Sequence, residues 1–359
     1  MGESTPADST AQASSAAAPH ANAPKDRLGR GLSDLRISVT DRCNFRCDYC
    51  MPKELYADDH GFMPRADILS FEETARIARI AVQQLGVSKL RITGGEPLLR
   101  RDLPELVRML ARIDGVSDLT LTTNGYLLAE HARALADAGL QRITISLDAL
   151  DPETFARMSG LGRALHRTLA GIAAAQAAGL HPIKLNCVVI RGQNEHAVEA
   201  LARRFRGSPH VVRFIEYMDV GTRNGWDPAL VVSADEILAR VSRVGELVPI
   251  PDEPGRVAER YRYADGRGEV GVIASVTRPF CSGCSRGRLS ADGRLITCLF
   301  AHEGVSLRDP LRAGVSDAEL RDVIAGAWRR RDDRYSELRA ELRRRAPSKR
   351  RLEMYQIGG

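Results

Sequence analysis

A regular alternation of short apolar runs and amphipathic stretches constrains the fold of this chain most strongly. Between residues 35 and 217, short runs rich in branched apolar side chains are separated by stretches with apolar residues at three- and four-residue spacing. These two patterns predict strands and helices. The predicted strands are 35–40, 89–93, 118–122, 142–147, 183–189 and 211–217, and the predicted helices are 71–85, 103–113, 128–138, 163–178 and 195–205. Such a series forms a parallel sheet covered by helices, and six units are too few for a closed barrel of eight, so we predict an α/β fold with a partial (βα)6 barrel.

The rhythm changes after Gly221, which predicts a smaller C-terminal domain over residues 225–340, next to a barrel over 31–224. Its expected elements are a helix at 234–244, strands at 260–263 and 270–273, a hairpin around 291–293 and a helix at 317–331. Residues 1–30 are mostly Ala, Ser, Thr and Pro with little to bury, so we predict a disordered tail there. Residues 341–359 form a basic tail that ends in Gly358-Gly359.

Composition excludes several classes of protein. Hydrophobic residues make up 43% and charged residues 27%, which is typical of a globular chain, and no apolar run is long enough to span a membrane. The formal net charge of +6 is compatible with an anionic small molecule as much as with nucleic acid. The N-terminus lacks the basic and apolar regions of a signal peptide, so we expect a cytoplasmic protein.

Six of the seven cysteines fall into two close groups, and Cys187 stands apart. The odd number and the size of the chain argue against a disulfide framework, and clustered reduced cysteines indicate metal ligands.

The first group has the spacing C-x3-C-x2-C and consists of Cys43, Cys47 and Cys50, directly after the first predicted strand. Three thiolates on one loop can hold three irons of a [4Fe–4S] cluster, whereas a fully ligated cluster uses four cysteines. The fourth iron would then be open for chemistry. The alternative is a zinc site completed by a distant ligand, although zinc motifs usually come as paired C-x2-C units or with a pair of histidines.

The second group has the spacing C-x2-C-x13-C and consists of Cys281, Cys284 and Cys298. A structural zinc site completed by His302 is the alternative here. Arg286 and Arg288 follow the first two cysteines and would stabilise thiolates and attract an anion.

The first motif, with Tyr49 before its last cysteine and Gly94-Gly95-Glu96-Pro97 after the second predicted strand, resembles the radical S-adenosylmethionine (SAM) superfamily. That resemblance implies a partial barrel, a [4Fe–4S] cluster, and SAM bound to its open iron and cleaved to a 5′-deoxyadenosyl radical. It also implies SAM contacts from Tyr49, Gly95, Ser146 and Met218.

Within that superfamily, the stretch FCSGCSRGRLSADGRLITCLF over residues 280–300 closely resembles the GTP 3′,8-cyclase family, as do residues 37–43, 91–100 and 122–126 and the terminal Gly-Gly. Ser285 and Gly287 depart from residues more frequent there. The resemblance implies a second [4Fe–4S] cluster that binds the guanine, and conversion of GTP to (8S)-3′,8-cyclo-7,8-dihydroguanosine 5′-triphosphate, the first step of molybdenum cofactor biosynthesis.

A bound triphosphate requires several cationic side chains from different strands. By resemblance, the GTP contacts are Arg36, Arg91, Thr122, Lys184, Arg286, Gly287 and Arg288. Three of these cations lie in or beside predicted strands, where an unpaired charge is costly. Resemblance also assigns catalytic roles to Cys43, Cys47, Cys50 and Arg286, and to Gly358 and Gly359, whose tail reaches toward the active site.

The expected partners are SAM, GTP, a flavodoxin- or ferredoxin-like electron donor, the downstream cyclic pyranopterin monophosphate synthase and a second copy of the chain, but neither nucleic acid nor a membrane. One alternative is a peptide-modifying radical SAM enzyme with an auxiliary cluster, although those usually carry more than three C-terminal cysteines. Another is a zinc-binding nucleic-acid module, but no aromatic residues are interleaved with the basic C-terminus.

Overall fold

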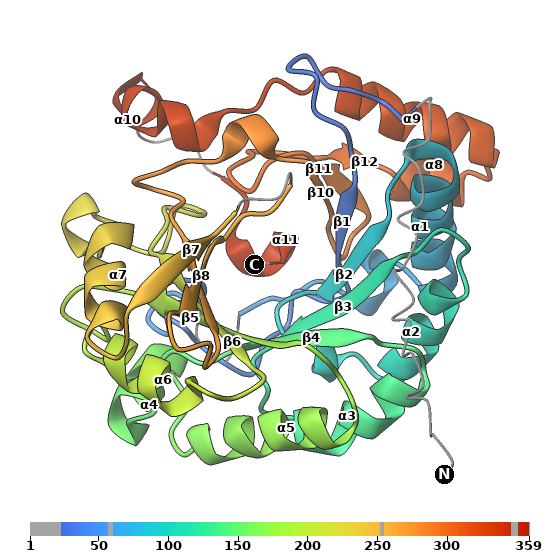
Figure 1. Ribbon diagram of the computed structural model, residues 1–359. Helices are drawn as coiled ribbons and strands as arrows, with labels where there is room; N and C mark the ends of the chain where they lie inside the picture. The colour runs from blue at the N-terminus through green and yellow to red at the C-terminus, as the bar shows by residue number, and fades with distance from the viewer. Residues whose placement is uncertain (1–22, 57–59, 252–254, 346–350, 359) are drawn as a thin grey trace, which may run out of the picture.

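The predicted α/β partial barrel is confirmed. A computed structural model describes residues 23–56, 60–251, 255–345 and 351–358, and its strands curve into an open ring with helices outside (Figure 1). The central strands are β1 (Asp34–Ser38), β2 (Lys89–Thr93), β3 (Asp118–Thr123), β4 (Arg142–Ser146), β5 (Ile183–Val189) and β6 (Val211–Glu216). They are parallel neighbours in sequence order. The bounds differ from the predicted ones by two residues at most.

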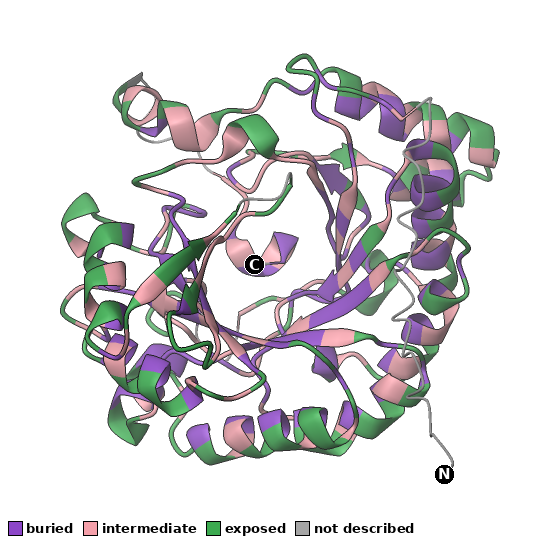
Figure 2. Ribbon diagram, viewed as in Figure 1, coloured by how far each residue is buried: buried purple, intermediate pink, exposed green. Residues whose placement is uncertain are grey.

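Helices cover the outer face of these strands. They are α1 (Phe71–Leu85), α2 (Leu103–Ala111), α3 (Leu128–Asp137), α4 (Pro152–Ser159), α5 (Leu165–Ala177) and α6 (Ala197–Phe205). The sequence sets the limits of α1, because Ser70 and Glu73 form a capping box at its start and Gly86 ends it with a φ of 82°. Figure 2 shows that the helices bury the side facing the strands and expose the other. Helix α4 was not predicted.

The C-terminal part of the chain extends this sheet at both edges. β9 (Glu269–Ile273) lies parallel to β6, and β10 (Arg286–Leu289) lies parallel to β1. Antiparallel strands complete the edges: β8 (Glu259–Tyr263) and β7 (Leu247–Ile250) beside β9, and β11 (Arg294–Ile296) and β12 (Val305–Ser306) beside β10. The expected hairpin is the turn from β10 to β11. Residues 225–340 therefore share the barrel's sheet rather than forming one of their own, and the division at residue 224 stays a prediction.

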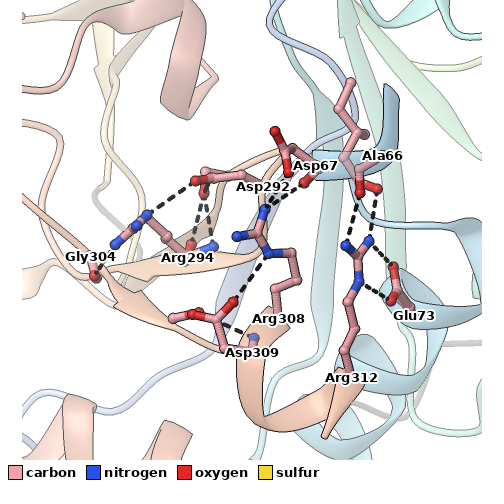
Figure 3. Close-up of polar contacts among 12 residues, drawn as sticks. Ala66, Asp67, Glu73, Asp292, Arg294, Gly304, Arg308, Asp309 and Arg312 are labelled. Carbon is pink, nitrogen blue, oxygen red and sulfur yellow. Dashed lines mark hydrogen bonds and ion pairs between the residues drawn. The ribbon is translucent and has the colours of Figure 1, made fainter. Parts of the chain in front are cut away.

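Polar contacts join the C-terminal part of the chain to helix α1 and to the residues just before it. Arg312, in α8 (Arg308–Arg312), donates to Glu73 of α1 over 2.7 Å and to the carbonyl of Ala66 over 2.8 Å (Figure 3). Arg308 of the same helix donates to the carbonyl of Asp67 in η1 (Arg65–Asp67) over 3.1 Å. Exposed ion pairs of this kind contribute only about 0–1 kcal/mol each. They connect α8 to α1 and to the segment that precedes α1.

Alternation along the strands decides what faces the centre of the ring. In β1, Leu35 and Ile37 are almost fully buried in the core between strands and helices, while Arg36 points the other way, into the ring. A closed eight-stranded barrel fills its interior with layers of branched side chains. Here the interior carries polar and charged residues around a cavity.

Both ends of the chain depart from the predicted tails. The prediction of disorder over residues 1–30 is wrong from residue 24 onward, because Lys25 pairs with Gly31 and the side chains of Asp26 and Arg30 are buried together. Residues 1–22 lie outside the described part of the chain.

At the other end, α9 (Asp317–Arg329) and α10 (Tyr335–Arg345) are followed by α11 (Met354–Ile357), which lies inside the ring (Figure 1). Buried Asp219 anchors this end, since it accepts hydrogen bonds from Arg339 over 2.8 Å and from Arg351 over 3.2 Å. The basic character of the tail therefore serves in part to bind a buried carboxylate. Across the described residues no helix is long and apolar enough to cross a membrane.

Candidate active site

A cavity of about 690 Å³ occupies the centre of the ring and brings the two cysteine groups together. Its lining includes the first cysteine group and the residues assigned to SAM, namely Cys43, Cys47, Tyr49, Cys50, Gly95, Ser146 and Met218. It also includes Arg36, Arg91, Thr122, Lys184, Cys281, Cys284, Arg286, Arg288 and Cys298. The fold thus gathers residues that are up to 262 positions apart in sequence, from Arg36 to Cys298, into one space.

The first cysteine loop follows the carboxyl end of β1 and is held largely by its own backbone. The N–H groups of Cys50 and Met51 donate to the carbonyl of Cys47 over 2.9 and 2.7 Å, and Arg46 donates to the carbonyl of Cys43 over 2.7 Å. The N–H of Phe45 lies 3.4 Å from Cys43 Sγ. Burial raises the pKa of Cys43 to about 12 and also raises the pKa values of Cys47 and Cys50. Three partly buried thiols facing one cavity, with a backbone N–H directed at the sulfur of Cys43, suit a cluster that supplies positive charge.

The Gly94-Gly95-Glu96 segment supports this loop. A Cβ on Gly95 would overlap the carbonyl oxygen of Arg42, so the glycine is needed where the segment crosses the residues before the first cysteine. The buried Glu96 carboxylate accepts from Thr123 Oγ1 and the Asn124 N–H, both over 2.7 Å, and its burial raises its pKa to about 7.

Two further residues on this side were not predicted. Asp148, just beyond β4, accepts a 2.9 Å hydrogen bond from the Tyr49 hydroxyl and one from the Val188 N–H, and burial raises its pKa to about 6. Asn124 follows β3 and donates to Asn44 over 2.8 Å. Both follow the carboxyl end of a strand, as does Met218, and this position was the available sequence signal.

The second cysteine loop lies beside β10 and β11. Cys281 begins η4 (Cys281–Gly283), Cys284 precedes β10 and Cys298 follows β11. Arg286 Nη2 lies 3.4 Å from Cys284 Sγ. Burial alone would raise the pKa of Cys284, but the charges of Arg286 and Arg331 outweigh it and lower the pKa to about 6.

The geometry of this loop does not favour the zinc alternative. His302 is exposed and is absent from the cavity lining. Throughout the described ranges, no three His, Cys, Asp or Glu side chains are grouped as ligands of a single metal ion, which is what a structural zinc site requires. The thiols of a cubane cluster each bind a different iron and need no such convergence.

A row of arginines crosses the sheet between the two loops. Arg288 on β10, Arg36 on β1 and Arg91 on β2 are register partners on neighbouring strands. The buried Nε atoms of Arg36 and Arg91 have no hydrogen-bond partner in the described part of the chain. Burial and the adjacent arginines, Arg288 first, hold the pKa of Arg36 well below its usual range. Like charges directly opposite one another are destabilising, so this row is complementary to an anion.

Lys184 and Arg213 continue the basic surface on β5 and β6. Burial, with a contribution from Arg213, lowers the pKa of Lys184 to about 7. Arg213 donates to Asn186 over 2.9 Å, and burial lowers its own pKa to about 9. Arg213 was not predicted, although it stands at an inward position of an apolar strand, as does Arg36, which was assigned by resemblance.

Gly287 and Gly358 were predicted as site residues but are not among the described residues that line the cavity. Gly287 lies on the outer face of β10, where an added Cβ would meet Leu32 Cδ1 at 2.9 Å, so only its backbone could reach a ligand. The carbonyl of Gly358 accepts a hydrogen bond from Arg288, and a Cβ there would overlap Thr93. Gly359 lies outside the described residues.

Comparison with family models divides the chain into two matched segments. Residues 37–205 match the model of the radical SAM superfamily, and residues 210–337 match the model described as Molybdenum Cofactor Synthesis C. The first contains the C-x3-C-x2-C loop and the second contains the C-terminal cysteines.

Curated relatives are similar over nearly the whole chain. A GTP 3′,8-cyclase of Acidothermus cellulolyticus is 56% identical over 88% of each chain. Proteins of the same name from Xanthomonas axonopodis pv. citri and Staphylococcus haemolyticus are 50% and 46% identical, each over 93% of this chain and 98% of the relative.

Solved structures are similar at the level of the fold. Streptococcus suis SuiB bound to its precursor peptide SuiA has a TM-score of 0.58 at 15% identity, covering 86% of this chain and 67% of that one. The SAM-bound form of SuiB has a TM-score of 0.56 at 16% identity, covering 74% and 60%. Identities this low support the shared fold alone.

Proposed function

The chain belongs to the GTP 3′,8-cyclase family of the radical SAM superfamily, and we infer that it catalyses the reaction of that family. The enzyme converts GTP to (8S)-3′,8-cyclo-7,8-dihydroguanosine 5′-triphosphate in molybdenum cofactor biosynthesis. The observation that carries this assignment in the chain itself is the central cavity. It has a three-thiol loop at each of two positions, and a row of partly or fully buried arginines lies between them.

The first loop is proposed to hold a [4Fe–4S] cluster through Cys43, Cys47 and Cys50. SAM then occupies the adjoining part of the cavity, against Gly95, Ser146 and Met218. Tyr49 would contact SAM while its hydroxyl stays fixed by Asp148. When bound, the cluster supplies the electron that cleaves SAM to the 5′-deoxyadenosyl radical. The chain's own contribution is to orient SAM and to exclude water from the radical.

The second loop is proposed to hold another [4Fe–4S] cluster through Cys281, Cys284 and Cys298, with the guanine as a ligand of its open iron. The triphosphate would lie along the arginine row, whose unpartnered Nε atoms are donors available to phosphate oxygens. The GTP contacts assigned by this proposal are Arg36, Arg91, Thr122, Lys184, Arg286, Arg288 and the Gly287 backbone, with Arg213 added. Holding both reactants in a near-attack geometry is worth up to about 7–11 kcal/mol of the barrier.

Gly358 and Gly359 are proposed to act on the substrate from the tail. Support comes from the contact between Arg288 and the Gly358 carbonyl, which brings the tail to the proposed triphosphate site. The remaining proposals are a cytoplasmic location, a homodimer, a low-potential flavodoxin- or ferredoxin-like donor and delivery of the product to cyclic pyranopterin monophosphate synthase. No nucleic acid or membrane is proposed as a partner.

Anaerobic reconstitution of the full chain tests the assignment. Two clusters correspond to about eight iron atoms with matching labile sulfide per chain. Incubation with SAM, GTP and a reductant should yield 5′-deoxyadenosine and the cyclised nucleotide by mass spectrometry. Zinc without sulfide would rule out both clusters, and deoxyadenosine formed with GTP left unchanged would rule out the substrate.

A further inference from the structure

The backbone of the second cysteine loop is held by guanidinium groups remote from it in sequence, whereas in the first loop the carbonyl of Cys43 accepts from Arg46 of the same loop. Arg30 Nη1 donates to the carbonyl of Cys281 over 2.7 Å, across 251 residues of chain. Arg331 Nη1 donates to the carbonyl of Cys284 over 2.8 Å. Arg331 Nε donates over 3.0 Å to the carbonyl of Thr297, the residue before Cys298. Two guanidiniums therefore hold the backbone at or beside all three cysteines.

One carboxylate orients both guanidiniums. Asp26 Oδ2 accepts from Arg30 Nε over 2.7 Å and from Arg331 Nη1 over 3.0 Å, while Asp26 Oδ1 accepts from the Arg30 N–H over 2.8 Å. The Asp26 side chain is fully buried, and those of Arg30 and Arg331 are 4% and 1% exposed. Each guanidinium has fixed donor directions, so its orientation decides which carbonyls it reaches.

The surroundings leave this network little freedom. Trp328 is fully buried, its indole N–H donates to the Arg30 carbonyl over 2.9 Å, and the Arg331 guanidinium lies 4.5 Å from the centre of its ring. Arg30 and Arg331 also line the central cavity. The network thus connects the segment before β1 to the walls of the proposed cluster site.

We propose that Asp26 is a positioning residue of the second cluster site, acting through Arg30 and Arg331 on the backbone that carries Cys281, Cys284 and Cys298. The inference rests on the proposed function, because it takes these cysteines as cluster ligands. It gives the segment before β1 a role in assembling the site where GTP would bind.

The test compares Asp26→Asn with Asp332→Asn in the reconstituted full chain. Asn keeps the size of Asp26 but loses the charge that orients two guanidiniums. Asp332 provides the matched control, because its ion pair with Arg27 joins the same two segments at 3.2 Å and both side chains are more than half exposed. Replacing a residue that supports a metal ligand typically changes metal affinity by about 10–100-fold. We therefore expect the second cluster, which holds half of the iron, to lose its iron to a chelator at least about 10-fold faster in Asp26→Asn than in Asp332→Asn.

Selectivity distinguishes positioning from general stability. The electron paramagnetic resonance signal of the second cluster, and its change on adding GTP, should weaken in Asp26→Asn. SAM cleavage at the first cluster should match that of Asp332→Asn. Equal loss of both clusters, or iron release unchanged from Asp332→Asn, overturns the proposal.

Arg30→Lys keeps the test decisive if Asp26→Asn does not fold. The ammonium retains the positive charge beside Asp26 but lacks the planar fork that reaches the Cys281 carbonyl. The same selective loss of iron is expected, and wild-type iron retention contradicts the proposal. The iron content of the wild-type chain tests the proposed function separately from the role of Asp26. About four iron atoms per wild-type chain would mean that there is no second cluster, which would reject the proposed function itself.

Discussion

The two cysteine loops face the same cavity in opposite electrostatic surroundings. Around the first loop, burial raises the pKa of Cys43 to about 12, and Asp148 adds a carboxyl group to the lining. Around the second loop, the charges of Arg286 and Arg331 overcome the effect of burial and lower the pKa of Cys284 to about 6. Not every thiol follows this division, because burial and Asp333 raise the pKa of Cys298 to about 12.

The difference indicates how one cavity could separate two reactants. SAM carries a sulfonium and an ammonium group, and GTP carries a triphosphate, so each is complementary to a different end of the cavity. The loops also differ in which arginines bind their carbonyls: Arg46 of the first loop binds the carbonyl of Cys43, whereas Arg30 and Arg331, from other parts of the chain, bind those of Cys281 and Cys284. We therefore expect the two sites to be separable by mutation.

The largest effects are expected from the cysteines. Cys47→Ala should abolish SAM cleavage, because one missing thiolate leaves the first cluster incomplete, and the same holds for Cys43 and Cys50. Cys284→Ala should keep SAM cleavage but abolish conversion of GTP. Deoxyadenosine and cyclised nucleotide are measured separately. Cys187→Ala is the control, since Cys187 is buried in β5 away from the cavity lining and should retain both products. Normal deoxyadenosine formation by Cys47→Ala would contradict the assignment.

The next effect concerns the arginine row. Arg36→Ala should weaken GTP binding by about 2–5 kcal/mol, as for a buried charged group that loses its partner, and should leave SAM binding nearly unchanged. The double replacement of Arg286 and Arg288 by Ala should act in the same direction. Equilibrium binding of each ligand is the measurement, and Arg294→Ala is the control because this arginine lies in the exposed network of Figure 3. Equal loss of both ligands would indicate a structural role for the row.

The third prediction concerns the terminal glycines, which lie beside the proposed GTP site. Gly358→Ala would place a Cβ against Thr93, and its φ of 69° is also unfavourable for alanine. Small misplacements near reacting groups cost about 10²-fold, and we expect a loss of that order in product formed per deoxyadenosine. Gly314→Ala has a similar φ of 82° with no atom within 4 Å of its Cβ, so it controls for backbone strain. Deleting Gly358 and Gly359 should act like Gly358→Ala with both clusters retained. Wild-type turnover by the deletion would mean that the tail has no role.

The smallest effect is a change in protonation at Lys184. Its pKa is lowered from 10.5 to about 7, first by burial and then by Arg213, Arg142, Arg91 and Arg256. A triphosphate would raise this pKa again, so GTP binding at about pH 8 should take up part of a proton and weaken as the pH rises further. Without ligand, the unfolded chain holds this proton more tightly than the folded chain, so the free energy of unfolding should rise with pH between about 7 and 10.5.

Calorimetry in buffers of different ionisation enthalpy measures the proton uptake. Lys184→Arg should remove it, because the guanidinium stays charged. Lys53→Arg, at an exposed position outside the cavity, should leave it unchanged. Equal uptake by Lys184→Arg and the wild-type chain would contradict this origin.

Periodicity and motif spacing were sufficient for much of the fold and the site. The bounds of β2 and β5 were predicted to the residue, because apolar side chains recur along each strand between polar turns. The cysteine loops were also identifiable, since C-x3-C-x2-C is a local pattern. Arg36 and Arg91 were assigned by resemblance, and their place inside apolar strands, where a charge is unusual, supported that assignment. Arg213 carried the same signal as Arg36 and was overlooked.

Other features depended on contacts that local sequence does not encode. β9 and β10 extend the barrel's sheet at its two edges. This arrangement depends on pairing between strands that are far apart in the chain. Residues 24–30 have the composition of a disordered segment, yet they are ordered because Asp26 is buried between Arg30 and Arg331, a partner some 300 residues away. The sequence by itself determined the six central strands, most of the helices and the two cysteine groups, because each is set by neighbouring residues. Only the tertiary structure decided which charges meet around the second cysteine loop, because buried charges are stabilised by partners in space rather than in sequence.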